Sequence, residues 1–66
     1  MARELELKGR TYVILSEPHE SGWRARVIER KVDGTEEHVG IEATAETRGL
    51  ADDMAERKLR RLLQAY

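Results

Sequence analysis

The stretch "EHVGIEATAE", residues 37–46, alternates between apolar and polar side chains more regularly than any other part of this 66-residue sequence. Its apolar positions are all odd-numbered: Val39, Ile41, Ala43 and Ala45. In an extended chain these side chains share one face, and the polar ones share the other. The alternation therefore predicts a β-strand with one buried face, which needs an apolar partner.

The chain after this stretch supplies that partner, because apolar residues recur there at helical spacing. The predicted buried stripe consists of Ala51, Ala55, Leu59, Leu62 and Tyr66, flanked by Met54 and Leu63. Thr47 stands where a hydroxyl can accept a hydrogen bond from the first turn, so it is predicted as the N-cap. The sequence thus predicts one helix that begins after Thr47 and covers the strand.

Two earlier strands are predicted in front of residue 37. In "GWRARVIERKV", residues 22–32, Trp23 and Val27 share one face and the arginines the other. In "LELKGRTYVIL", residues 5–15, Gly9 predicts a bulge or a bend, and residues 3–8 are an alternative separate edge piece. The segment "SEPHESG", residues 16–22, is typical of a surface turn between these two strands.

The loop between the second and third strands must keep Val27 and Val39 on the same face. A two-residue Asp-Gly turn would place them on opposite faces, so that register is excluded. A loop with an odd number of residues restores it. We expect a type I turn over residues 31–34 with Gly34 left-handed, or a wider five-residue loop.

The predicted fold is a single α+β domain over residues 1–66, a three-stranded antiparallel β-meander with one C-terminal α-helix packed on one face (β-β-β-α). The other face of the sheet is open. If Tyr12 lies opposite Ile28 and Ile14 opposite Arg26, that open face carries an apolar spot beside Gly40. Tyr12, Ile14 and Ile28 are therefore predicted as a homodimer interface.

Composition excludes several classes of function. The 12 basic and 13 acidic residues nearly cancel, so no global field attracts a polyanion. The absence of cysteine, with two histidines, excludes a disulfide framework and a Cys/His zinc site, and no cofactor is predicted. No apolar run has the length of a membrane span or of a signal peptide. We therefore expect a cytoplasmic protein with no membrane partner.

The cations near the end of the chain have two interpretations. Asp53 and Glu56 lie one helical turn before Arg57 and Arg60, so ion pairs within a solvated helix are the first. The second is a nucleic-acid surface, for which phosphates need cations that converge on one groove. The residues assigned to that surface are Arg48, Arg57, Lys58 and Arg61 of the helix, with Arg24 and Arg26 of the second strand.

No catalytic residues are predicted. His19, Glu20 and Ser21 lie together in the first loop, but a nucleophile needs a rigidly held base and a third group that orients the base. Asp52 and Asp53 are adjacent on the predicted helix, so they point about 100° apart and cannot act on one bond. The sequence thus indicates a non-enzymatic protein.

The segment "GIEATAETRGLADDMAERKLRRLL", residues 40–63, resembles the last strand and second helix of double-stranded RNA-binding domains. The similarity lies in a glycine within the strand, then Thr47 and Arg48, then Ala51 and Ala55. It implies a matching β-β-β-α order and RNA binding. Where that family has a lysine cluster at the helix start, this chain has Gly49 and later Asp52, and the family's first helix is missing.

The segment "TYVILSEPHESGWRARV", residues 11–27, is similar to the opening of HicB-type antitoxins, which are partial ribonuclease H-like domains. Both have a tyrosine and aliphatic strand, a turn with proline and acidic residues, and a strand with glycine and an aromatic residue. The proline-glycine motif of that family is replaced here by "ERKVDGTEEH", residues 29–38. The expected function is a protein-interaction or antitoxin-like module that forms homodimers through the open sheet face or an edge strand; the alternative is an RNA-binding module.

Overall fold

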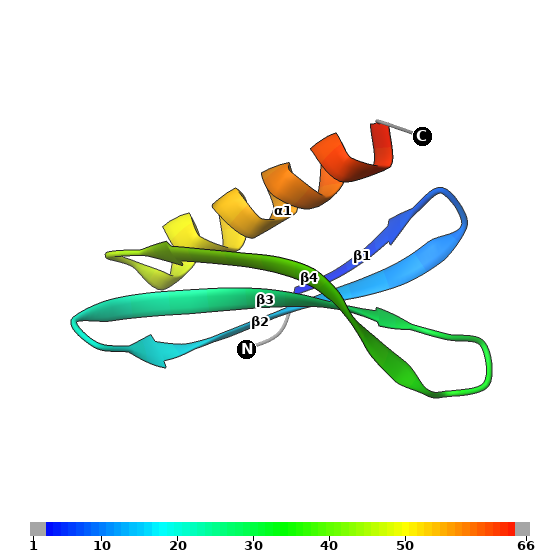
Figure 1. The fold of residues 1–66 in the computed structure, drawn as a ribbon, viewed down its shortest axis with the longest axis horizontal. Coiled ribbons are helices and arrows are strands. Elements are labelled where there is room, and N and C mark those ends of the chain that lie inside the picture. The colour runs from blue at the N-terminus through cyan, green and yellow to red at the C-terminus, as the bar shows by residue number, and fades with distance from the viewer. Residues whose placement is uncertain (1–2, 65–66) are drawn as a thin grey trace.

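The computed structural model describes residues 3–64, which form four strands and one helix in the order β-β-β-β-α (Figure 1). The elements are β1 (Arg3–Leu7), β2 (Arg10–His19), β3 (Gly22–Arg30), β4 (Glu36–Ala45) and α1 (Arg48–Gln64). The strands form one antiparallel sheet in chain order, with β1 and β4 at its edges. The α+β class with a C-terminal helix is confirmed, but the prediction of three strands was wrong.

The additional strand results from a turn at Lys8 and Gly9, which separates β1 from β2. Both residues have positive φ angles, 53° and 75°, and Leu7 pairs with Arg10 on either side of them. Two consecutive positive φ angles define the type I′ turn, whose twist matches that of a β-hairpin. Residues 3–7 therefore fold back as a separate edge strand, which was the alternative for this segment.

The hairpin between β2 and β3 is tighter than the sequence indicated. Only residues 20–21 lie in its loop, and His19 pairs with Gly22. Strand β2 extends through Pro18, because β1 pairs with β2 only as far as Ile14 and leaves the edge of β2 free beyond it. Proline lacks an N–H group, so such an unpaired edge is where a strand tolerates it.

This tight loop changes which side chains share a face. A two-residue loop pairs even-numbered with odd-numbered residues, so Ile14 lies opposite Val27 rather than Arg26. The predicted register, with Tyr12 opposite Ile28, was wrong, since Val13 occupies that position. Tyr12 and Ile14 consequently lie on the face that α1 covers.

The hairpin between β3 and β4 follows the prediction of a five-residue loop, residues 31–35. Gly34 has a φ of 90°, and its N–H donates to the Lys31 carbonyl at 3.0 Å. Asp33 Oδ1 accepts from the Thr35 hydroxyl at 2.7 Å and from the Thr35 N–H at 3.0 Å. Both hydrogen bonds lower the pKa of Asp33, and the one from the hydroxyl has the larger effect.

Helix α1 lies across one face of the sheet, and the core fills the space between them (Figure 1). The buried side chains are Tyr12, Ile14, Ala25, Val27, Ala43, Ala51, Ala55 and Leu59, with Trp23, Val39 and Ile41 packed against them. This confirms the predicted inner face of the sheet, but Met54, predicted to flank the buried stripe of the helix, is exposed. The helix begins as predicted, because the Leu50 N–H donates to Thr47 Oγ1 at 3.2 Å. The predicted contact of Tyr66 lies outside the described residues.

The β3–β4 pairing contains a bulge. Between the pairs Arg26–Glu42 and Ile28–His38, β3 contributes one residue and β4 contributes three, residues 39–41. Gly40, at the centre of the three, has a φ of 83°, which a residue with a side chain rarely adopts. Because β4 gains two residues, its side chains keep their faces on both sides of the bulge.

Candidate functional site

The basic residues assigned to nucleic-acid binding do not converge on one surface. Arg24 and Arg26 project from β3 on the open face of the sheet, the face opposite α1. The others, Arg48, Arg57, Lys58 and Arg61, lie on α1. The sheet separates the two groups, so no groove gathers all of these cations.

The open-face arginines are engaged with carboxylates. Arg24 and Arg26 contact Glu17 Oε1 at 3.0 and 3.4 Å. The hydrogen bond from Arg24 is the main reason that the pKa of Glu17 is lowered. Arg30 pairs with Glu4 at 3.0 Å. Each of these three arginines is therefore paired with a carboxylate of another strand.

Arg48 joins the start of α1 to the sheet. Its Nε donates to Ser16 Oγ at 2.9 Å, and its guanidinium carbon lies 5.6 Å from the centroid of the Trp23 ring. The distance is that of a cation–π contact. Arg48 therefore has a structural task within the domain, positioning α1 over β2 and β3.

Lys58 is engaged with backbone at the edge of the sheet. Its Nζ donates to the Glu42 carbonyl oxygen at 2.9 Å. Helix α1 thus caps one acceptor of the edge strand β4 through this lysine.

The expected ion pair between Asp53 and Arg57 is replaced by contacts with β1. Arg3 Nη1 donates to Asp53 Oδ1 and to Glu56 Oε1, both at 3.0 Å. Arg60 also donates to Glu56. Burial tends to raise the pKa of Glu56, but the hydrogen bonds from Arg3 and Arg60 outweigh it and lower this pKa. The expected pair of Glu56 with Arg60 is thus confirmed, whereas Asp53 is held by Arg3.

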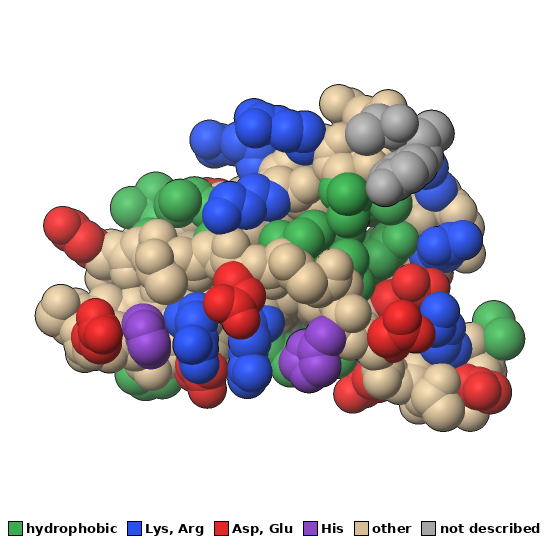
Figure 2. All heavy atoms as spheres, viewed as in Figure 1, with side chains coloured by type: hydrophobic (Ala, Val, Ile, Leu, Met, Phe, Trp, Pro, Cys, Tyr) green, Lys and Arg blue, Asp and Glu red, His purple; other side chains and the backbone are tan. Residues whose placement is uncertain are grey.

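Arg57 and Arg61 consequently have no ion pair within residues 3–64. They continue a line of two exposed apolar residues, Leu50 and Met54, whose side chains are 54% and 37% exposed. We call these four residues the outer stripe, since they are spaced three or four apart and so share one side of the helix. Figure 2 shows hydrophobic and basic side chains gathered along the edge formed by α1.

The predicted homodimer residues do not form an exposed patch. Tyr12 and Ile14 are 2% and 0% exposed and belong to the core under α1. Ile28 does lie on the open face, but beside Val13 it is only 5% exposed. Their placement together on the open face was wrong, because the register of the β2–β3 hairpin was wrong by one residue.

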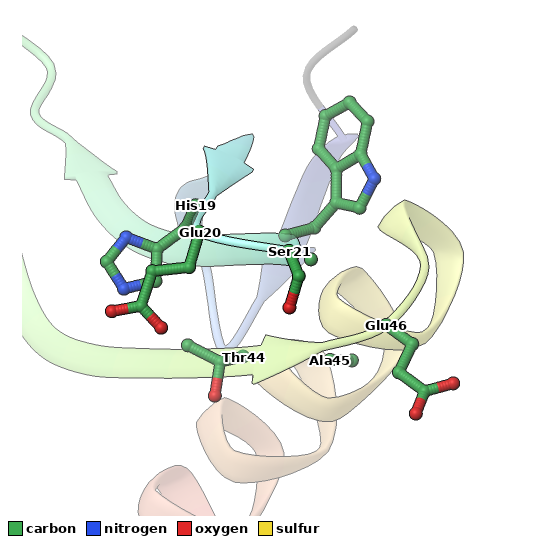
Figure 3. A pocket seen from close by; sticks show the side chains of 8 residues that line it. His19, Glu20, Ser21, Thr44, Ala45 and Glu46 are labelled. Carbon is green, nitrogen blue, oxygen red and sulfur yellow. The ribbon is translucent and has the colours of Figure 1, made fainter.

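A hollow of about 290 Å³ lies beside the β2–β3 loop, lined by residues 19–23 and 44–46 (Figure 3). His19 and Glu20 lie together on one side of it, and Ser21 lies apart from both. No hydrogen bond joins Ser21 to His19 in the described part of the chain. No three potential metal ligands converge anywhere within residues 3–64. Within the described residues, the hollow thus holds neither a hydrogen-bonded serine–histidine pair nor a cluster of three potential metal ligands.

Comparison of the chain with protein families, curated proteins and solved structures found no match. The resemblances to double-stranded RNA-binding domains and to HicB-type antitoxins stay predictions. Within residues 3–64, α1 is neither long nor apolar enough to cross a bilayer.

Proposed function

We propose that this domain is a non-enzymatic binding module that holds an acidic protein partner against the outer stripe of α1. The observation that carries the proposal is that Arg57 and Arg61 lack an ion pair within residues 3–64 and directly continue the exposed Leu50 and Met54.

The outer stripe is energetically unfavourable when only water covers it. Like charges four residues apart on a helix repel each other, and here Asp53 and Glu56 are drawn away by Arg3 and Arg60. A partner that places carboxylates beside Arg57 and Arg61 relieves this repulsion. The same partner gains apolar contact if it also covers Leu50 and Met54.

A protein partner fits the stripe better than a nucleic acid does. Phosphates would use the two arginines but gain nothing from the apolar half of the stripe. Arg24 and Arg26, which were assigned to the same surface, lie on the opposite face, where both contact Glu17. Nucleic-acid binding, the alternative function, is thus less well supported.

The experiment titrates the ¹⁵N-labelled domain with a designed helical peptide of leucine and glutamate, and separately with duplex RNA. We expect the peptide to shift the amide signals of residues 50–61. Arg61→Glu should weaken peptide binding by about fivefold or more, because it reverses one contacting charge. The matched control is Arg10→Glu, an exposed cation of β2 away from the stripe, which should leave the affinity unchanged.

Two results would overturn the proposal. One is shifts that fall outside α1, or an affinity equally reduced by both substitutions. The other is duplex RNA binding more tightly than the peptide, with an affinity that falls by orders of magnitude between low and physiological salt, which would assign the stripe to nucleic acid.

A further inference from the structure

The free edge of β4 is a second surface of the domain that can bind a partner. This strand pairs only with β3, so one row of its backbone groups faces outward. The Glu42 carbonyl belongs to this outward row, because the ammonium group of Lys58 donates to it from outside the sheet. The edge therefore presents hydrogen-bonding groups to which another strand can pair.

The bulge leaves β4 with more backbone groups than β3 at the centre of this edge. Residues 39–41 face only Val27 in β3, so their backbone groups outnumber those of their partner. A hollow of about 540 Å³ lies here, lined by Arg26, Val27, His38, Gly40, Ile41 and Glu42. Since a Cβ atom at Gly40 would meet no atom within 4 Å, the space beside this glycine is open.

We propose that β4 pairs antiparallel with β4 of a second copy of this chain, about a two-fold axis at Gly40. In this register Val39 lies opposite Ile41 of the second copy, and His38 lies opposite Glu42 of the second copy. The symmetry repeats each of these contacts once. The two sheets join into one continuous sheet, with both helices on the same side.

The sequence of β4 is self-complementary in this register and so favours a second copy over an unrelated strand. Val39 and Ile41 are half-buried on the helix face, and their pairing extends the apolar layer under α1 across the junction. His38 and Glu42 are exposed on the open face, where imidazole can donate to carboxylate. The amide of His38 in the second copy replaces Lys58 as the donor to the Glu42 carbonyl.

The proposal does not depend on the outer stripe, since it uses a different surface and a different partner. It also replaces the open-face dimer that was expected around Tyr12 and Ile14. A homodimer thus remains proposed, but through an edge strand.

Sedimentation equilibrium from micromolar to millimolar concentration tests this pairing. We expect a reversible dimer whose dissociation constant rises by about tenfold or more in His38→Glu and in Glu42→Lys. The first substitution puts two carboxylates opposite each other twice, and the second removes the acceptor of the His38 imidazole twice. The double variant H38E/E42K should return the dissociation constant to near the original value. In the double variant each carboxylate again lies opposite a cation of the second copy.

The matched control is Glu6→Lys, an exposed glutamate of the opposite edge strand β1, which should leave the dissociation constant unchanged. Circular dichroism of each variant confirms that it is folded. The proposal is overturned if the folded protein stays monomeric at millimolar concentration. It is also overturned if the single variants dimerise normally, or if the double variant fails to recover.

Discussion

At the scale of single residues, Gly22 shows how closely the β2–β3 hairpin approaches the end of β4. A Cβ atom at this position would lie 2.5 Å from the Ala45 carbonyl oxygen, a backbone atom that cannot move aside alone. We expect Gly22→Ala to lower the free energy of unfolding by about 1–3 kcal/mol, as overpacking typically does. Urea denaturation measures this value.

Gly49 provides the matched control, because a Cβ atom there meets nothing within 4 Å and the residue lies within α1. Alanine loses less backbone entropy than glycine on entering a helix. Gly49→Ala should therefore raise the stability by about 0.5–1 kcal/mol. Equal destabilisation by both substitutions would show that the close approach at Gly22 is not the cause.

At the scale of elements, the arginines of α1 differ in their partners and should differ in their contribution to stability. Arg60 donates to Glu56 four residues earlier, whereas Arg57 has no ion pair within residues 3–64 and lies beside Arg61. Arg60→Gln should cost about 0.3–0.5 kcal/mol, the usual value of such a helical pair, and the cost should vanish at high salt. Arg57→Gln should change the stability by less than about 0.2 kcal/mol. Thermal denaturation at two salt concentrations distinguishes them, and equal losses would show that Arg57 has a partner within the domain.

The elements themselves were predictable to different degrees. Strand β4 and helix α1 follow from periodicity, because one face of each is buried and the pattern records that burial. The loop at Gly34 follows because the faces of β3 and β4 had to match. The turn at Lys8 was not predictable as a hairpin, since lysine is not a residue that favours a positive φ angle. Residues 12–15 are all apolar, so the sequence does not show which of their side chains face the core. The register of β2 therefore stayed ambiguous.

At the scale of the whole molecule, the candidate site depended on contacts that sequence spacing does not contain. Arg57 has no ion pair within residues 3–64 because Arg3, some fifty residues earlier, binds Asp53. That contact exists only because β1 is a separate strand whose inner face lies under α1. Likewise, the division of the arginines between two faces follows from the sheet and not from their positions in the chain. Local pairing rules predicted the helix but not which of its cations lack an ion pair.

The total stability of the domain determines which core substitutions leave it folded. Leu59 is fully buried between α1 and the sheet, and a single core in a chain of 66 residues rarely supplies more than about 3–5 kcal/mol of stability. Leu59→Ala should remove about 2–5 kcal/mol, which is enough to unfold much of the population at room temperature. Leu15→Ala, at an open-face residue that is 39% exposed, should cost less than about 1.5 kcal/mol and leave the domain folded. Amide signal dispersion in NMR spectra, together with urea denaturation, measures both variants. Similar stability of the two variants would show that burial under α1 does not set the cost of truncating Leu59.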